Sequence, residues 1–320
     1  MDFLITLFDT LQQWLFEQAV QPALFALGLG NFLEDGYNAT AWLLVGLLQI
    51  AIMLAVIGPL QRWRPVEPVT NRATIRTDVL YTLIHRLGLF RLVLFFTLEP
   101  WFDEIFGALR TAGYGTFHLD QLWPGVTDIA LVSFLAYLVV FDFAGYWLHR
   151  GQHQIDAWWR LHALHHAQQQ MTMWSDNRNH LLDDVLIDTL MVLLAQVIGV
   201  PPGQFVALVA FTQLSESLQH ANVRLHFGRI GERLWVSPRF HRLHHSIGIG
   251  HEQPGQSQTL GGCNFGVLLP WWDVLFGTAN FSNRYDPTGV RDQVELPQRN
   301  YGQGFWAQQW LGVKRLAGRA

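Results

Sequence analysis

The chain contains a single cysteine, Cys263, among its 320 residues. One cysteine excludes an internal disulfide and a zinc site built on a Cys-x-x-Cys pair. Charged residues make up only 14% of the chain, well below the roughly 25% typical of soluble globular proteins. We therefore expect a protein in which apolar surface, rather than disulfides or surface charge, determines fold and location.

Positive charge is absent from the start of the sequence, where the first basic residue is Arg62. A secretory signal needs a positively charged N-terminal region, so no signal peptide is expected. The net charge of −4 says nothing about nucleic acid. No dense basic patch is present, and nucleic acid is not expected as a partner. The sequence also lacks the HExxH motif of zinc hydrolases and a phosphate-binding glycine loop.

Apolar residues, in contrast, are abundant: half of the chain is hydrophobic, with 14 tryptophans and 22 phenylalanines. Residues 42–60 carry no charge and are long enough, at about 1.5 Å per residue, to cross a bilayer. Residues 78–98 and 128–148 are further candidate spans. Residues 181–219 hold two apolar stretches split by a Pro-Pro-Gly turn, which predicts a helical hairpin. Residues 3–29 are interrupted by polar side chains, so an interfacial helix and a spanning helix both stay open.

The distribution of basic residues predicts which loops face the cytoplasm. If 42–60 runs inward, the outer loops 30–41, 99–127 and 201–203 hold one basic residue, Arg110. The inner segments are richer in arginine and lysine, as the positive-inside rule requires. This topology predicts a multi-pass membrane protein, in the inner membrane if the host is bacterial, with its histidine-rich segments on the cytoplasmic side.

Histidines gather in three short clusters with i, i+3 and i+4 spacings, which point side chains from one helix face toward one place. The clusters are His149 and His153, then His162, His165 and His166, then His241, His244 and His245. Neutral imidazole is the commonest protein ligand for transition metals. One ion rarely takes more than about six ligands, so the pattern predicts a site for two ions. Interfacial histidines without metal and a bis-histidine haem, which would use only two of them, are the alternatives.

Asp142 precedes His149 by seven residues, two helical turns back on the same face. A carboxylate inside a membrane span usually has a polar partner, and a metal-bound imidazole usually donates its other N–H to such a group. We expect Asp142 to accept a hydrogen bond from a ligand histidine. A polar contact between helices is the alternative.

Read together, these segments resemble the fatty acid hydroxylase/sterol desaturase superfamily of integral-membrane di-iron oxygenases. The resemblance covers residues 130–280 in order, whereas residues 1–125 carry no comparable motif. The matching segments are DFAGYWLHR (142–150) with His153, WRLHALHH (159–166), QHANVRL (219–225), SPRFHRLHHS (237–246) and WWDVLFGT (271–278).

The resemblance implies a ligand set for the two metal ions, which consists of His149, His153, His162, His165, His166, His220, His241, His244 and His245. Glu216, four residues before His220, is expected to orient that histidine. His180, Asn222 and His226 are candidates for a tenth ligand, and His85, His118 and His251 are expected to have ordinary structural roles.

The resemblance also implies an all-α fold of polytopic membrane helices with a cytoplasmic helical cap that carries the dimetal site. It divides the chain into N-terminal membrane helices (1–125), a catalytic domain (126–282) and a C-terminal interfacial tail (283–320). The implied activity is hydroxylation of a C–H bond in a membrane lipid by O2 at two irons. The chain holds no cytochrome-like or flavin domain, so a separate ferredoxin- or cytochrome-type donor would supply the electrons.

Two other functions remain compatible with the sequence. A lipid or sterol desaturase would use the same di-iron site and remove two hydrogens instead of inserting oxygen. A non-enzymatic metal-binding or transport protein would need polar residues through the middle of the membrane, and few are present there. Substrate, position of attack and oligomeric state are not encoded in these spacings.

Overall fold

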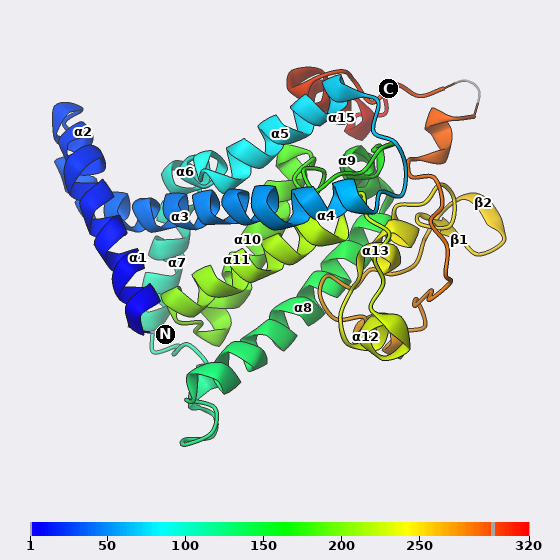
Figure 1. Ribbon diagram of the computed structural model, residues 1–320. Coiled ribbons are helices and arrows are strands. Elements are labelled where there is room, and N and C mark those ends of the chain that lie inside the picture. Colours follow the sequence, from blue (N-terminus) through cyan, green and yellow to red (C-terminus); the bar gives the residue numbers. More distant parts are fainter. Residues whose placement is uncertain (1, 296–297, 320) are drawn as a thin grey trace.

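The computed structural model describes residues 2–295 and 298–319, and it is a bundle of long helices with a cap of short helices and loops at one end (Figure 1). Within the described ranges, strands occur in one short hairpin, β1 (Glu252–Gln253) and β2 (Gln256–Leu260). The prediction of an all-α fold is confirmed.

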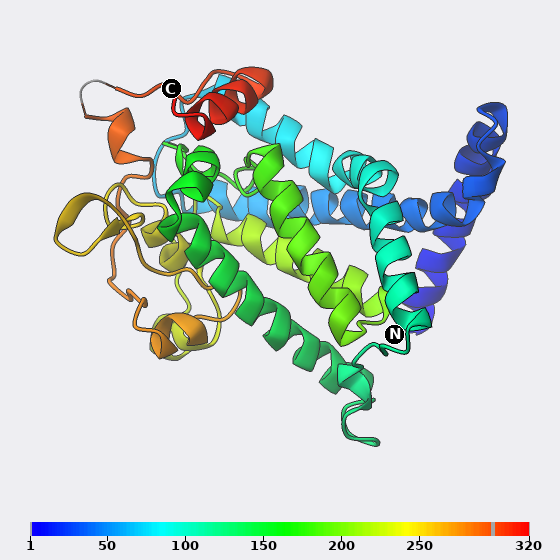
Figure 2. The ribbon, with the colours of Figure 1, turned by 180° about the vertical axis from the view of Figure 1, so that it is seen from behind.

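The N-terminal segment folds as α1 (Asp2–Leu15), a π-helical turn (Phe16–Val20) and α2 (Gln21–Ala26). In both ribbon views it runs across the end of α3 (Leu33–Ile52) rather than beside it (Figures 1 and 2). Residues 3–29 are not among the helices that are long and apolar enough to cross a membrane. The two alternatives for this segment remain predictions.

Two continuous helices have the length and apolar composition of membrane spans. The first covers Gly30–Trp63 and joins α3 to α4 (Gly58–Trp63) through a π-helical turn, Met53–Ile57. The second is α8 (Ala130–Gln154), which contains most of the predicted span 128–148 and continues through the first histidine cluster. Together with the family described below, these helices indicate a membrane protein.

The predicted span 78–98 is divided between two helices. α5 (Arg72–Arg86) begins at Asn71, whose side chain caps it by accepting a hydrogen bond from the Thr74 amide. It ends before Gly88, whose φ of 79° is the left-handed conformation that glycine adopts at little cost. α6 (Leu89–Thr97) continues at an angle of 49°, so the pair forms at most one bent span.

The hairpin predicted over 181–219 is present as α10 (Leu181–Ile198) and α11 (Pro202–Gln219). Gly199, with φ of 62°, ends the first helix, and Pro202 begins the second. Neither helix is among the candidate spans. The three aspartates of α10 and the polar second half of α11 distinguish them from lipid-facing helices. Instead they pack against α8 and line a cavity.

Shorter helices complete the molecule around the end of α8. α9 (Asp156–His166) follows α8 directly, and α15 (Phe305–Leu316) packs against α9 and α5. The remaining elements are a 3-10 turn before α3 (Gly30–Phe32), α7 (Glu99–Thr111), a 3-10 turn (Leu119–Gln121), α12 (Gly228–Leu234), α13 (Pro238–His244), α14 (Trp271–Leu275) and a 3-10 turn (Arg291–Gln293).

The bundle is stabilised by a core shared between α8, the α10–α11 hairpin and the loop before α14. Tyr137, Leu138, Leu208 and Leu268 are buried in one cluster there. At about 25 cal/mol per Å² of apolar surface, such burial is the dominant favourable contribution to the fold. The core fixes the first half of α8 relative to the loop, and His149 and His153 follow in the last turns of the same helix.

Candidate dimetal centre

All nine histidines of the predicted ligand set lie at the capped end of the bundle. His149 and His153 belong to the last turns of α8, and the second cluster belongs to α9. His220 directly follows α11. The third cluster belongs to α13, which begins where Ser237 accepts a hydrogen bond from the Phe240 amide. Four separate helices therefore deliver side chains to one buried place.

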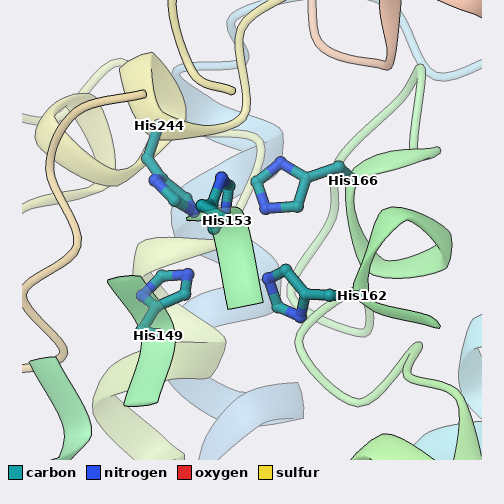
Figure 3. A group of neighbouring side chains, drawn as sticks. All are labelled: His149, His153, His162, His166 and His244. Carbon is teal, nitrogen blue, oxygen red and sulfur yellow. The ribbon is translucent and has the colours of Figure 1, made fainter. Parts of the chain in front are cut away.

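The nine rings form two groups. Within each group, one nitrogen from every ring lies within 4.8 Å of those of all the others. Figure 3 shows the five-histidine group, whose rings come from α8, α9 and α13 and face one another. The five-histidine group consists of His149, His153, His162, His166 and His244, and the four-histidine group of His165, His220, His241 and His245. The adjacent pairs His165/His166 and His244/His245 are split between the groups, as a two-ion site requires.

Three rings of the five-histidine group make contacts through the nitrogen that points away from the centre of the group. His149 Nδ1 lies 2.9 Å from the Phe265 carbonyl oxygen, and His244 Nδ1 lies 2.8 Å from that of Cys263. His162 Nδ1 lies 3.1 Å from the Asp183 carboxylate. An Nδ1–H that donates to such an acceptor leaves the Nε2 lone pair free on the inner side of the ring.

The four-histidine group is tighter. His220 Nε2 lies 3.2 Å from His165 Nε2 and 3.1 Å from His241 Nε2, and His245 Nε2 lies 3.1 Å from His241 Nε2. Two nitrogens in neighbouring positions on one ion, each about 2.1 Å from it, are about 3 Å apart when they meet at a right angle. The separations therefore fit ligands that share one ion.

Burial keeps the cap histidines in the form that binds metal. Desolvation, reinforced by the neighbouring imidazoles, holds the pKa of His165, His166, His241 and His245 well below the usual range. These rings are therefore neutral at physiological pH, with a lone pair available.

The buried nitrogen atoms provide a test of whether metal ions fit. Both ring nitrogens of His153 and of His166, and the inner Nε2 of His162 and His244, are buried without a hydrogen-bond partner in the described structure. Such unpartnered polar atoms destabilise a fold unless something binds them. Two transition-metal ions, one per group, would satisfy them, and the chemistry of nine neutral imidazoles suits such ions.

Asp183 is a site residue that the sequence reasoning missed. Its carboxylate accepts hydrogen bonds from Gln152 Nε2 at 2.9 Å and from Trp158 Nε1 at 2.6 Å, in addition to its contact with His162. It connects α8, α9 and α10 directly behind the five-histidine group. No spacing indicated this role, because Asp183 lies 21 residues from His162.

The expected role of Asp142 is wrong. Its carboxylate accepts hydrogen bonds from the amides of Leu268 and Leu269, at 2.7 and 3.1 Å, and from Trp272 Nε1 at 2.8 Å. Seven residues of helix separate it from His149 by about 10 Å, so the two side chains do not meet. Asp142 instead ties α8 to the loop that carries the Phe265 carbonyl, and thus supports His149 indirectly.

Glu216 does hold His220, but through its backbone: the Glu216 carbonyl oxygen lies 2.8 Å from His220 Nδ1. Of the three candidates for a tenth ligand, none belongs to either group. His180 Nε2 lies 2.9 Å from the Gln309 carbonyl of α15. Asn222 Oδ1 accepts from the Val66 and Glu67 amides. His226 Nδ1 accepts from the Gly228 amide.

The three remaining histidines also lie outside both groups. His85 lies 3.4 Å from the Asp184 carboxylate, and His118 packs beside Gly199. His251 stacks on Trp159, with ring centroids 5.4 Å apart, and burial lowers its pKa to about 4. Trp159 in turn contacts His153 and His166, so His251 supports the wall behind the five-histidine group.

A cavity of about 340 Å³ extends from the histidines between the helices of the bundle. Its volume is within the usual range for small-molecule sites, roughly 300–1,000 Å³. His149 and His162 of one group and His165, His220 and His241 of the other reach its wall. Away from the histidines much of its lining is apolar and is supplied mainly by α6, α8, α10 and α11, for example Leu94, Phe141, Met191 and Phe205.

Residues 134–278 match the family model for the fatty acid hydroxylase domain. Residues 134–278 therefore form a domain of the fatty acid hydroxylase/sterol desaturase superfamily, and the helical fold and the two histidine groups agree with this assignment. The sequence-based assignment to this family is confirmed. No solved structure matches the chain.

Three of the curated relatives are named as hydroxylases or monooxygenases. Ornithine lipid hydroxylase OlsE of Rhizobium tropici is 27% identical over 74% of this chain and 67% of its own length. Human alkylglycerol monooxygenase is 26% identical over 44% of this chain and 29% of its own length. Fatty acid hydroxylase vlmA of a Lecanicillium species is 23% identical over 48% and 44%. The chain thus spans less than half the length of the last two.

Proposed function

We propose that the protein hydroxylates a C–H bond of a membrane lipid, with O2 as co-substrate and two iron ions held by the nine histidines. The observation that carries the proposal is the meeting of both histidine groups with one largely apolar cavity between the helices. Relatives named as lipid hydroxylases and monooxygenases support this assignment. Iron is proposed because O2 chemistry needs a redox-active metal, which zinc is not.

Two bound irons would supply the reduction of O2 and the insertion of one oxygen atom into the C–H bond. The balance is one lipid C–H, one O2, two electrons and two protons in, and one lipid C–OH and one water out. The residues of the chain itself would hold the ligand rings in place and orient the lipid. Asp183 and the carbonyls of Phe265 and Cys263 fix the rings of the five-histidine group. The apolar lining aligns the lipid and keeps bulk water from the reacting carbon.

We further propose that the histidine end faces the cytoplasm, in keeping with the distribution of basic residues. A separate one-electron carrier of the ferredoxin or cytochrome type would then reach the cap from the soluble side, while the lipid enters from the bilayer. Desaturation at the same site remains the alternative reaction. The names of the relatives favour hydroxylation. A non-enzymatic metal-binding protein would have no use for the cavity.

The decisive experiment compares membrane lipids from cells that express the intact chain or a His165→Ala/His166→Ala variant, under 18O2. This variant removes one ring from each group. We expect a lipid that gains one labelled oxygen only with the intact chain. A lipid that loses two hydrogens without label would make the protein a desaturase. Absence of iron from the purified intact chain would overturn the di-iron proposal.

A further inference from the structure

Helix α15 turns large apolar side chains outward and polar ones inward. Its outward side carries Trp306, Trp310 and Val313, and the two tryptophans are 80% and 60% exposed. We call these three residues the tryptophan face. The inward side includes Gln308 and Gln309, which are buried. A helix on the surface of a soluble protein has the opposite arrangement, so the tryptophan face suits contact with something less polar than water.

The inward side of α15 is bound to the protein, which fixes this orientation. Gln309 Nε2 donates to Tyr81 Oη at 2.9 Å and to the Asn179 carbonyl at 3.0 Å. Arg315 Nε donates to the Arg160 carbonyl of α9 at 3.1 Å. A rotation of α15 that buried the tryptophans would break these hydrogen bonds and leave the donors without their acceptors. The outward tryptophans are therefore a fixed feature of the fold.

The neighbouring helix α5 shows at what level of the bundle α15 lies. α5 exposes Arg72 and Arg76 in its first turns, whereas the exposed side chains of residues 80–96 in α5 and α6 are all apolar. α15 meets α5 at Tyr81, whose ring centre lies 4.8 Å from that of Phe305. α15 thus lies beside the point where this bent span changes from charged to apolar surface (Figures 1 and 2). Such a change is typical of the boundary between lipid headgroups and hydrocarbon.

The first candidate span shows the same change toward the capped end of the bundle (Figure 1). Leu54 and Val56 are exposed within it, whereas Arg62, Trp63 and Arg64 are exposed where it ends. Tryptophan and arginine at the end of a span are typical of the interface between lipid and water. Two separate segments therefore indicate a membrane boundary on the histidine side.

The inward side of α15 also holds the two helices behind the five-histidine group. It contacts α9 through Arg160, as described above, and His180 Nε2 lies 2.9 Å from the Gln309 carbonyl oxygen. Gly312 fits against the His180 ring, where an added Cβ would clash. His180 caps α10, three residues before Asp183. A force that holds α15 in place would therefore also hold the starts of α9 and α10.

We propose that the tryptophan face of α15 binds the membrane surface on the histidine side, and that the bilayer thereby supports the helices behind the five-histidine group. A tryptophan ring is stable at this interface because its body is apolar and its indole N–H is polar. The Lys314 ammonium lies 5.7 Å from the centre of the Trp310 ring, so it can reach lipid phosphates beside that ring. α15 contains no acidic residue that would repel them. The inference adds a partner and does not depend on the proposed reaction.

The position of α15 can be tested on the full chain in nanodiscs of mixed zwitterionic and anionic phospholipids. A fluorophore on Val313→Cys reports contact with lipid nitroxides. We expect a nitroxide near the headgroup end of the acyl chain to remove most of the fluorescence, because an interfacial helix lies about 5–10 Å into the boundary. A nitroxide at the methyl end should quench less. Gln256→Cys, exposed in the β-hairpin of the cap, should not be quenched, and the intact chain gives the background from Cys263.

Trp306→Gln/Trp310→Gln removes the tryptophan face and keeps the inward contacts. It should reduce the quenching at Val313 and lower severalfold the iron retained after dialysis against a chelator. Trp101→Gln/Trp123→Gln is the matched control. These two tryptophans are 66% and 67% exposed, on α7 and before α8, at the opposite end of the bundle (Figure 1). Their replacement should change neither quantity.

Fluorescence at Val313→Cys that neither nitroxide quenches would overturn the membrane contact. If Trp306→Gln/Trp310→Gln then also abolished self-association of the chain, the face would be an interface with a second copy. Quenching at Val313→Cys combined with equal iron retention in the two double variants would overturn the support of the site. None of these results changes the 18O experiment, so failure of this inference and failure of the proposed hydroxylation are distinguishable.

Discussion

Single residues behind the histidines decide which ring nitrogen faces the centre. In the five-histidine group the outward nitrogens of His149 and His244 meet backbone carbonyls, whereas that of His162 meets the Asp183 carboxylate. A carboxylate partner raises the basicity of a ligand imidazole more than a carbonyl does. Asp183 is therefore the side chain in this layer whose replacement should affect metal binding most directly.

We expect Asp183→Asn to weaken iron binding by about 10- to 100-fold, the usual cost of losing such a partner. The amide keeps the size of the side chain but cannot accept hydrogen bonds from Gln152, Trp158 and His162 with both of its terminal atoms. Iron retained after dialysis against a graded series of chelator concentrations measures the change.

Asp184→Asn is the control for this prediction. Asp184 is the next residue on α10, and its carboxylate faces His85 rather than a ring of either group. Its replacement should leave the retention of iron close to that of the intact chain. Equal losses in both variants would show that negative charge near the site, and not the contact with His162, determines affinity.

At the scale of elements, the close approach of α3 to α5 depends on one small residue, Gly46. Gly46 of α3 lies against the carbonyl oxygen of Arg86 at the end of α5, where any Cβ would clash with it. Small residues serve this purpose in membrane bundles because backbones can then pack directly. The contact also positions Arg86, whose guanidinium binds Asp176 and Ser217 deep in the bundle.

Gly46→Ala should therefore lower the free energy of unfolding by about 1–3 kcal/mol, the usual cost of an overpacked contact. Thermal unfolding in detergent, followed by circular dichroism, measures it. Gly107→Ala in α7 is the matched control, because no described atom outside its own helical turn lies within 4 Å of the place that an added Cβ would take. It should be neutral or stabilising, since alanine favours a helix. Equal midpoints for the two variants would contradict the role of Gly46.

The sequence predicted most of these elements where a local rule applies. Apolar length predicted α3 and α8, and the Pro-Pro-Gly turn predicted the α10–α11 hairpin. The bend between α5 and α6 was not predicted, because the apolar pattern continues through Gly88 and only its left-handed backbone ends the helix. The position of α15 was also missed, since it depends on Gly312 fitting against His180, which is far away in the chain.

At the scale of the whole molecule, the predicted topology decides which end faces the cytoplasm, and the single cysteine allows a direct test. Burial raises the pKa of the Cys263 thiol to about 12, so it reacts slowly with maleimides at neutral pH. Cysteines introduced at exposed positions can therefore be labelled on this background. Ala112, after α7, and Gln256, in the β-hairpin of the cap, are exposed and lie on opposite sides in the predicted topology.

We expect a membrane-impermeant maleimide to label Ala112→Cys in intact spheroplasts and Gln256→Cys only after lysis. The intact chain, with Cys263 alone, is the control and should stay unlabelled in both conditions. Labelling of Gln256→Cys before lysis and of Ala112→Cys only afterwards would reverse the topology and place the histidines on the outer side.

The sequence by itself determined the family, the helical class and the nine histidines, because i, i+3 and i+4 spacings fix which side chains share a helix face. It did not determine how those faces meet. Tertiary structure alone divided the rings into groups of five and four, and it replaced Asp142 by Asp183 as the carboxylate behind the site. These features depend on contacts between residues far apart in the chain, and local spacing carries no information about such contacts.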